Sequence, residues 1–296
     1  MIATPTEFRY HASGMTFAAL GWGPGDGPLA LCLHGYPDTA WTWRHLGPQL
    51  ATQGWRVVAP FMRGYAPTDL APDRCYQVGA LARDANEAHT SLGGDDRAVL
   101  IGHDWGAVAA YAAAAQHDQP WRRIATLAIP PLASLAAPPR SVREARVTVR
   151  QLVFSSYMLY QQLPVVSERS LPWLIPLLWR RWSPGYDGRE DVERVFAALD
   201  SRARRTAALR YYRAMLQPWY RRREYAPEQR RMFAPPRCPA LVLHGEDDGC
   251  MQAALSTRAA HSLPEGCELA LIGGAGHFLQ LERPDEVNRR IAAFIG

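Results

Sequence analysis

The sequence predicts an α/β fold in which helices flank a mostly parallel sheet and one helical segment interrupts the order of strands. Short runs that are apolar on both faces alternate with helical stretches, as expected for buried parallel strands joined by crossover helices. This alternation stops at Pro130-Pro131 and resumes at residue 240, and the stretch between is helical, aromatic and rich in arginine. A chain of 296 residues is long enough for one large core with such an insertion.

The individual elements are predicted from local patterns in chain order. Residues 8–12 and 15–22 are expected to form an opening hairpin with its turn at Ser13-Gly14. Further strands are expected at residues 29–33, 57–61, 98–101, 124–129, 240–243 and 268–272. Helices are expected at residues 41–52, 78–92, 107–116 and 285–295.

The division into domains follows from where the strands lie. We expect residues 1–130 and 232–296 to form the core and residues 131–231 to form a helical lid over the carboxyl ends of the strands, where open parallel sheets bind ligands. The lid would carry 19 of the 33 basic residues, all of them arginine, against 9 acidic residues. No nucleic-acid-binding motif accompanies this charge, so we interpret the arginines as solvated helix faces and expect no nucleic-acid partner.

Cysteine usage and the N-terminal segment predict a cytoplasmic protein. The five cysteines are odd in number, lack a Cys-x-x-Cys spacing and lie mostly beside apolar strands, which favours free thiols in a reducing compartment. Residues 1–13 carry charged side chains and lack the apolar core of a secretory signal. No apolar run approaches the roughly 18 residues that a membrane span needs. The oligomeric state is left open, with a homodimer among the alternatives.

The most informative motif is Gly102-His103-Asp104-Trp105-Gly106, which lies between a predicted strand and a predicted helix. A strand, a sharp turn and a helix form an elbow that pushes its central side chain into a pocket, and the flanking glycines let the strand and the helix approach each other. The carboxylate of Asp104 can attack carbon without a base to activate it. This residue therefore suits displacement at an sp³ carbon, which gives an alkyl ester that a second step must hydrolyse.

Two other segments place candidate groups beside this elbow. The loop His34-Gly35-Tyr36-Pro37 follows the predicted strand at 29–33, so the backbone N–H groups of Tyr36 and Trp105 can form an oxyanion hole. Asp248, with Asp247 as the alternative, follows the strand at 240–243 and can orient a histidine. His277 lies in a glycine-rich loop after the strand at 268–272. The order nucleophile, acid, histidine is the order that α/β-hydrolases use.

With these residues, nearly the whole chain resembles the α/β-hydrolase superfamily, and its details resemble the epoxide hydrolases. His103-Asp104-Trp105-Gly106 matches the aspartate nucleophile motif of that family, His34 to Pro37 matches its His-Gly-x-Pro loop, and Arg63-Gly64-Tyr65 resembles the Arg/Lys-Gly-Tyr that follows its next strand. The resemblance implies an α/β-hydrolase fold with an inserted lid. It also implies hydrolysis of an epoxide to a vicinal diol by a catalytic triad of Asp104, His277 and Asp248.

Epoxide hydrolases also carry two lid tyrosines that hydrogen-bond the epoxide oxygen. The stretch from Tyr157 to Pro164 fits the first of these, with Tyr157 in the role and Tyr160 as the substitute. Tyr211-Tyr212-Arg213 fits the second, with Tyr212 in the role and Tyr211 as the substitute. The side chains expected to line the substrate pocket are Trp105, Tyr36, Tyr160 and Met158.

The resemblance implies a small apolar epoxide as substrate and neither a metal nor an organic cofactor, and no metal or dinucleotide motif stands in a suitable context. Two alternatives remain open. A haloalkane dehalogenase uses the same Asp-Trp elbow, with the indole of Trp105 holding halide, but that family usually has Asn or Glu where this chain has Tyr36. A non-enzymatic binding protein of the same fold would be expected to lack part of the triad.

Overall fold

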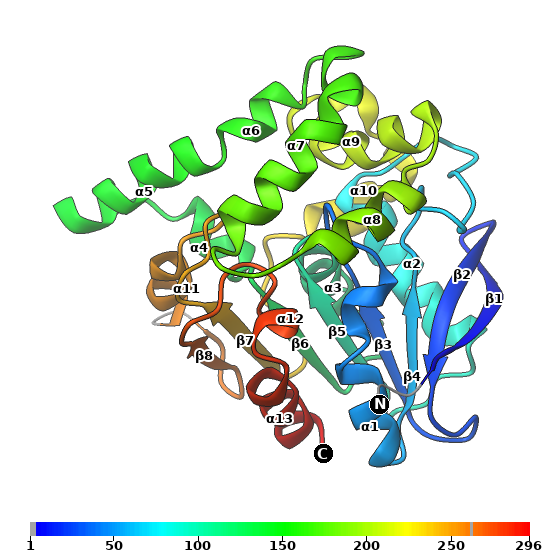
Figure 1. The fold of residues 1–296 in the computed structure, drawn as a ribbon. Helices are drawn as coiled ribbons and strands as arrows, with labels where there is room; N and C mark the ends of the chain where they lie inside the picture. The colour runs from blue at the N-terminus through cyan, green and yellow to red at the C-terminus, as the bar shows by residue number, and fades with distance from the viewer. Residues whose placement is uncertain (1–3, 261–262) are drawn as a thin grey trace.

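The computed structural model describes residues 4–260 and 263–296, and its centre is one eight-stranded sheet (Figure 1). The strands lie in the order β1-β2-β4-β3-β5-β6-β7-β8. The pairs β1–β2 and β2–β4 are antiparallel and all the other pairs are parallel. The strands are β1 Thr6–Ala12, β2 Met15–Trp22, β3 Leu29–Leu33, β4 Arg56–Pro60, β5 Val99–His103, β6 Arg123–Leu127, β7 Ala240–Gly245 and β8 Glu268–Ile272. The predicted α/β fold is confirmed, and each predicted strand is found within about two residues.

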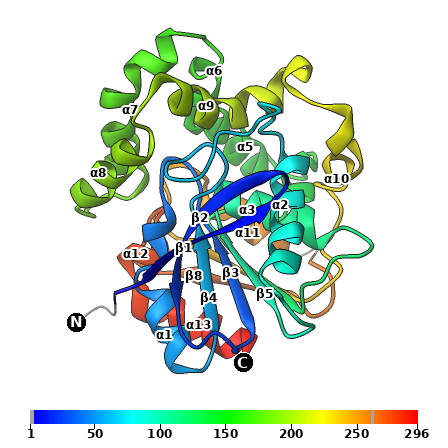
Figure 2. The ribbon, with the colours of Figure 1, turned by 90° about the vertical axis from the view of Figure 1, so that its right-hand side faces the viewer.

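The strands in the middle of the sheet are apolar on both faces because helices cover both faces. Every residue of β3, β5 and β7 is buried. Helices α1 (Leu46–Thr52) and α13 (Pro284–Ile295) pack together on one face, and α2 (Val78–Ser91) and α3 (Trp105–Ala114) pack together on the other (Figure 2). This arrangement explains why the strand pattern is continuous rather than alternating.

One predicted helix is wrong in its extent. In place of a single helix over residues 41–52, the structure has a 3₁₀ helix η1 (Ala40–Trp43) and then α1, which starts at Leu46. The Thr39 side chain caps η1 by accepting a hydrogen bond from the Trp41 N–H. Pro48 lies in the first turn of α1, where its missing N–H leaves no intrahelical hydrogen bond unmade. The proline therefore suits the start of a new helix rather than the middle of a longer one.

Between β6 and β7 the chain forms helices only, in a stretch that the structure describes throughout. Figure 1 shows α6 to α9 above one end of the sheet and α5 projecting outward past the edge formed by β8. Helix α10 lies beside α2, where the Gly79 N–H donates to the Gln229 side chain at 2.8 Å. The division at residues 131 and 231 remains a prediction. The helices are α4 Leu132–Ala136, α5 Val142–Phe154, α6 Ser156–Tyr160, α7 Val166–Trp182, α8 Arg189–Ala198, α9 Arg202–Leu216, η2 Pro218–Tyr220, η3 Arg223–Tyr225 and α10 Ala226–Arg230. Beyond β7 follow α11 Ala253–Ala260 and α12 Leu279–Glu282.

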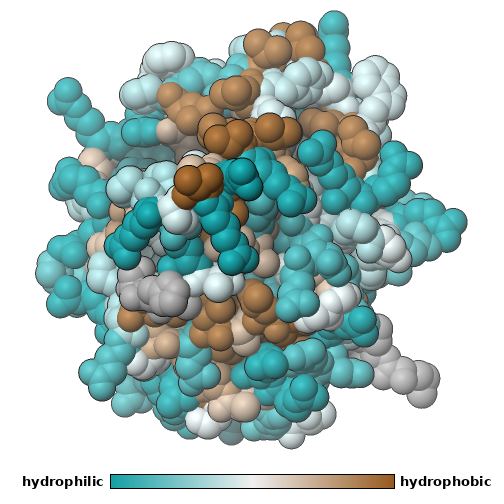
Figure 3. All heavy atoms as spheres, turned by 90° about the vertical axis from the view of Figure 1, so that its left-hand side faces the viewer, coloured by the Kyte–Doolittle hydropathy of each residue, from teal (hydrophilic) through white to brown (hydrophobic). Residues whose placement is uncertain are grey.

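Two of the inserted helices differ in how they are covered. Helix α7 continues through Pro172 and Pro176 and buries Leu171, Ile175 and Trp182 along one side. Helix α5 buries none of its residues. Figure 3 views the molecule from the left-hand side of Figure 1, and on this face apolar surface lies among hydrophilic side chains. Of the helices that the structure describes, none is long and apolar enough to cross a membrane.

Candidate active site

Asp104 occupies the turn between β5 and α3 in a strained backbone conformation. Its φ is 50° and its ψ is −116°, a combination that side-chain-bearing residues rarely adopt outside functional sites. A Cβ atom on Gly102 would lie 2.3 Å from the carbonyl oxygen of Gly106, and one on Gly106 would lie 2.2 Å from that of Leu33. Both glycines are therefore required for the close approach of β5, α3 and the end of β3. This geometry is the predicted elbow.

The loop after β3 brings a backbone donor to the Asp104 carboxylate. The Tyr36 N–H donates to Asp104 Oδ1 at 2.8 Å. Trp105 is the first residue of α3, so its N–H has no intrahelical acceptor. The loop is anchored by His34, whose Nε2 accepts a hydrogen bond from the Met62 N–H at 2.9 Å. Burial lowers the pKa of His34 to about 4, so its ring stays neutral and can accept.

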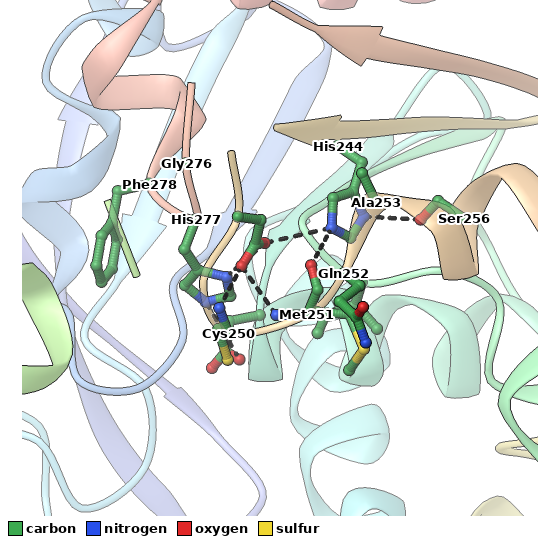
Figure 4. Close-up of polar contacts among 12 residues, drawn as sticks. His244, Cys250, Met251, Gln252, Ala253, Ser256, Gly276, His277 and Phe278 are labelled. Carbon is green, nitrogen blue, oxygen red and sulfur yellow. Dashed lines mark hydrogen bonds and ion pairs between the residues drawn. The ribbon is translucent and has the colours of Figure 1, made fainter. Parts of the chain in front are cut away.

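His277 lies between two carboxylates. Its Nδ1 is 2.9 Å from Asp248 Oδ2, and its Nε2 is 3.6 Å from Asp104 Oδ2. Since a carboxylate only accepts, Nδ1 carries the hydrogen of the bond to Asp248 and Nε2 faces Asp104. The second oxygen of Asp248 accepts hydrogen bonds from the N–H groups of Cys250 at 2.7 Å and Met251 at 2.9 Å (Figure 4).

The charges of this group set its protonation. Burial alone would lower the pKa of His277, but the carboxylates of Asp248 and Asp104 outweigh it and raise that pKa to about 10. Burial alone would raise the pKa of Asp248, but His277 and His244 hold it below its usual value. The acid therefore remains ionised, and the histidine is a cation as long as Asp104 carries its charge.

The end of α7 fixes the two loops that carry the acid and the histidine. The carbonyl oxygen of Trp182 accepts hydrogen bonds from Gly249 N–H at 3.1 Å and from His277 N–H at 2.9 Å. A Cβ atom on Gly276 would lie 2.5 Å from the same oxygen, which explains the glycine before the histidine. No local sequence pattern indicates this contact, because Trp182 belongs to a helix that is far from both loops in the chain. Asp247, the alternative acid, is exposed, whereas Asp248 is buried against His277.

A cavity of about 80 Å³ opens above the Asp104 carboxylate. The inserted helices form one wall and the ends of β5 and β7 form the other. Of the four residues expected to line the substrate pocket, Trp105 and Met158 line this cavity. Tyr36 and Tyr160 are not among the lining residues that the structure describes. The Tyr36 ring is instead buried against Tyr212, with ring centroids 5.1 Å apart. The lining residues are Asp104, Trp105, Val108, Ile129, Leu132, Leu135, Ser155, Tyr157, Met158, Tyr212, Met215, Cys250 and Met251.

Two tyrosines from the inserted helices reach this cavity. Tyr157 comes from α6 and Tyr212 from α9, and their ring centroids are 5.7 Å apart. The Tyr212 hydroxyl is buried and has no hydrogen-bond partner, and the Tyr157 hydroxyl lies 3.7 Å from the Cys250 sulfur. Burial raises the pKa of both phenols well above the usual value, so both keep their protons and can donate. By contrast, the Tyr211 hydroxyl already donates to the Arg63 carbonyl at 2.9 Å.

Other parts of the molecule offer less chemistry. A larger surface hollow of about 600 Å³ lies between β2, β4 and α1, and it brings together no nucleophile, acid and base. Among the described residues, no group of three or more histidine, cysteine or acidic side chains has the arrangement of a metal site. Among the residues of the candidate site that escaped the sequence analysis, Cys250 lines the cavity and His244 packs against Asp248. The signal for His244 was present, because it lies four residues before Asp248 on the same strand and loop.

Comparisons with known proteins agree with this geometry. Residues 30–290 match the model of the alpha/beta hydrolase family. The chain is 27% identical to epoxide hydrolase A of Mycobacterium tuberculosis, with 99% of this chain and 98% of the relative covered. It is 28% identical to the AB hydrolase superfamily protein YfhM of Bacillus subtilis, with 96% of each covered. The crystal structure of epoxide hydrolase A from Mycobacterium thermoresistibile superposes with a TM-score of 0.75 at 27% identity over 98% of each chain.

These relatives confirm the resemblance to epoxide hydrolases that the motifs predicted. The match of the family model covers most of the chain, from β3 into α13. The protein belongs to the alpha/beta hydrolase family.

Proposed function

We propose that the protein is an epoxide hydrolase, which converts an epoxide to a vicinal diol through a hydroxyalkyl ester on Asp104. One observation carries the proposal: a carboxylate at the elbow faces a histidine–aspartate pair on one side and two poorly partnered phenols on the other. A serine hydrolase has no use for two phenols above its nucleophile. An epoxide needs them, because its oxygen leaves carbon as an alkoxide.

Ring opening is the first half-reaction. Asp104 attacks one epoxide carbon from behind, and Tyr157 and Tyr212 donate hydrogen bonds to the oxygen as it leaves. The Oδ1 atom of Asp104 is held by the Tyr36 N–H, so Oδ2 is the oxygen that is free to form the new bond to carbon. A tyrosine supplies the proton that the alkoxide takes up. The product is a neutral ester that remains attached to the elbow.

Ester hydrolysis is the second half-reaction, and the first half-reaction prepares it. Forming the ester removes the charge of Asp104, which is one of the two charges that raise the pKa of His277. The pKa of His277 then falls, and its proton returns through water to the tyrosinate that ring opening leaves behind. The neutral ring can now take a proton from the attacking water through Nε2. Water attacks Cγ of Asp104, and the N–H groups of Tyr36 and Trp105 receive the oxyanion on Oδ1. Asp248 holds the Nδ1–H of His277 throughout.

The cavity supports an apolar substrate. Apart from Asp104, the two tyrosines and Ser155, its lining is aliphatic, aromatic or sulfur-containing. We further propose that residues 131–231 act as a lid, because they supply both tyrosines and much of the cavity wall. The substrate would then be enclosed between the sheet and the inserted helices, away from water.

A haloalkane dehalogenase is the second candidate, and one observation favours it. The indole Nε1 of Trp105 is buried without a hydrogen-bond partner, so it could donate to a leaving halide. Yet two phenols beside it serve a leaving alkoxide better than a halide, because an alkoxide must also gain a proton.

One assay separates the two candidates. The purified protein is incubated with terpene, fatty-acid, styrene-type and polyketide epoxides and with a matched set of chloro- and bromoalkanes. We expect a diol from at least one epoxide and no halide from the haloalkanes. Release of halide without formation of any diol would overturn the proposed function in favour of the dehalogenase.

A further inference from the structure

A second histidine, His244, touches the acid of the triad. It lies in β7, is fully buried, and comes four residues before Asp248. Its Nε2 is 2.8 Å from the carbonyl oxygen of Met251 and 3.3 Å from Asp248 Oδ2. Its Nδ1 is 2.7 Å from the hydroxyl of Ser256 on α11. Figure 4 shows that His244 and His277 reach this cluster from different elements, β7 and the loop after β8.

The partners of His244 fix where its hydrogen is. A carbonyl oxygen only accepts, so Nε2 carries the hydrogen that binds Met251. In the neutral ring Nδ1 is then an acceptor, and the Ser256 hydroxyl donates to it. The N–H edge of His244 thus faces Asp248 Oδ2, the oxygen that also binds His277.

We propose that His244 is a positioning residue of the active site: its Nε2–H holds the Met251 carbonyl and lies against Asp248 Oδ2, which keeps the Asp248 carboxylate aimed at His277. The hold is twofold. By fixing Met251, His244 also fixes the backbone N–H that binds the other oxygen of Asp248. By facing Oδ2, it opposes rotation of the carboxylate away from His277.

The inference rests on the proposed function, because it concerns the step in which His277 activates water. During that step His277 gains a proton and its Nδ1–H bond to Asp248 strengthens. A carboxylate held on both oxygens loses little freedom when this happens, so the step needs little reorganisation. Ring opening does not use Asp248 directly. His244 should therefore affect ester hydrolysis and leave alkylation of Asp104 nearly unchanged.

The same contact predicts a change in pH dependence. The His244 N–H stabilises the negative charge on Asp248 Oδ2. When it is removed, the Cys250 N–H still holds the other oxygen, so the carboxylate stays beside His277 and its charge acts more strongly on the ring. The pKa of His277 in the ester should then rise, and hydrolysis should need a higher pH. A purely structural role for His244 would lower the rate without moving this midpoint. The titratable groups around His277 and Asp248 are Asp104, His103, Cys250, His244 and Glu282.

The test compares His244→Phe with His244→Gln. Phenylalanine fills the space but donates nothing, whereas the glutamine amide can keep a donor near the position of Nε2. His89→Phe is the matched control, since His89 is also buried and bonded to a carbonyl oxygen, that of Asp95, but contacts Trp121 rather than the site. Single-turnover experiments with an epoxide hydrolysed by the wild type measure alkylation and ester hydrolysis separately, each over a range of pH.

We expect His244→Phe to slow ester hydrolysis by about 10- to 100-fold, to raise its pH midpoint and to leave alkylation nearly unchanged. His244→Gln should restore most of the rate, and His89→Phe should match the wild type. The proton NMR signal of the His277 Nδ1–H should also shift in His244→Phe, which reports on the site without turnover. If His244→Phe hydrolyses the ester with the wild-type rate and midpoint, the inference is wrong while the proposed function stands. If the wild type itself forms no ester, the proposed function fails instead.

Discussion

The two sides of the active site differ in whether their buried polar groups have hydrogen-bond partners within the protein. On the sheet side, Asp248 is fully buried and both its oxygens have donors: His277 on one, and the N–H groups of Cys250 and Met251 on the other. On the side of the inserted helices, the Tyr212 hydroxyl is also buried, yet it has no hydrogen-bond partner. Beside it, at the start of α3, the indole N–H of Trp105 is buried without a partner as well.

This contrast indicates what each side binds. A charge that is present throughout the reaction needs permanent partners, so the donors around Asp248 are occupied by the protein itself. A charge that exists only while the epoxide opens needs donors that are otherwise free. Leaving a buried donor unpaired costs about 1–3 kcal/mol of folding free energy. An unpaired buried phenol is therefore expected only where a bound ligand accepts its hydrogen bond.

The largest effect should come from the residue between the two sides. Asp104→Ala removes the nucleophile while the glycines that permit the elbow remain, so turnover should be abolished with the fold intact. Steady-state diol formation and circular dichroism check the two halves of this prediction. Steady turnover of any epoxide by Asp104→Ala at the wild-type rate would exclude the covalent mechanism.

Breaking the sheet side should stop the reaction halfway. His277→Gln leaves Asp104 and both tyrosines in place, so the epoxide should still open, but the base for the second step is gone. We expect one burst of substrate consumption per active site, followed by accumulation of the ester. Mass spectrometry of the intact protein measures the added mass. A variant that shows neither burst nor adduct would mean that His277 acts in ring opening.

Breaking the other side should slow the first step alone. Tyr157→Phe or Tyr212→Phe removes one donor to the leaving oxygen, and ring opening should fall by roughly 10- to 1000-fold. Ester hydrolysis should hardly change. Because the Tyr212 hydroxyl has no partner, Tyr212→Phe should also leave the free energy of unfolding within about 0.5 kcal/mol of the wild type or raise it. Ring opening at the original rate in the double variant would remove the tyrosines from the mechanism.

The smallest effect is the pH dependence of stability. Because the pKa of His277 is raised from 6.5 to about 10 in the folded protein, its charge stabilises the fold fully below pH 6.5, and this contribution is lost as the pH rises through 10. Urea unfolding at pH 6.5 and pH 9.5 should therefore show a larger loss of stability for the wild type than for His277→Gln. Equal losses in the two proteins would mean that His277 is not held as a cation.

Much of the fold could be predicted because its signals are local. Strands buried on both faces give continuous apolar runs, and the turn at Asp104, the loop with Tyr36 and the loop with Asp248 each follow one of those strands. The loop with His277 follows the partly exposed edge strand β8. The helix over residues 41–52 was predicted wrongly because the helical pattern runs on through Pro48, which instead belongs to a first turn. The position of Pro48 indicates the start of a helix, but the helical periodicity of residues 41–52 favoured one longer helix.

The rest depended on contacts between distant segments. Which tyrosine of a neighbouring pair reaches the cavity depends on how α6 and α9 dock, and the sequence could not separate Tyr212 from Tyr211. The Trp182 carbonyl meets two loops that lie far along the chain, and no local pattern announces it. The spacing of His244 from Asp248 is a local signal, but the contact of His244 with Ser256, on another element, is not.

The covalent ester on Asp104 is tested most directly by following oxygen through a single turnover in ¹⁸O-labelled water. When His277 activates water against Cγ of Asp104, the new oxygen joins the carboxylate, and the diol leaves with one oxygen from the epoxide and one from Asp104. The tryptic peptide that contains Asp104 should therefore gain the label, and the first diol should be largely unlabelled. A labelled first diol with an unlabelled peptide would show that water attacks the epoxide directly and that Asp104 acts as a general base.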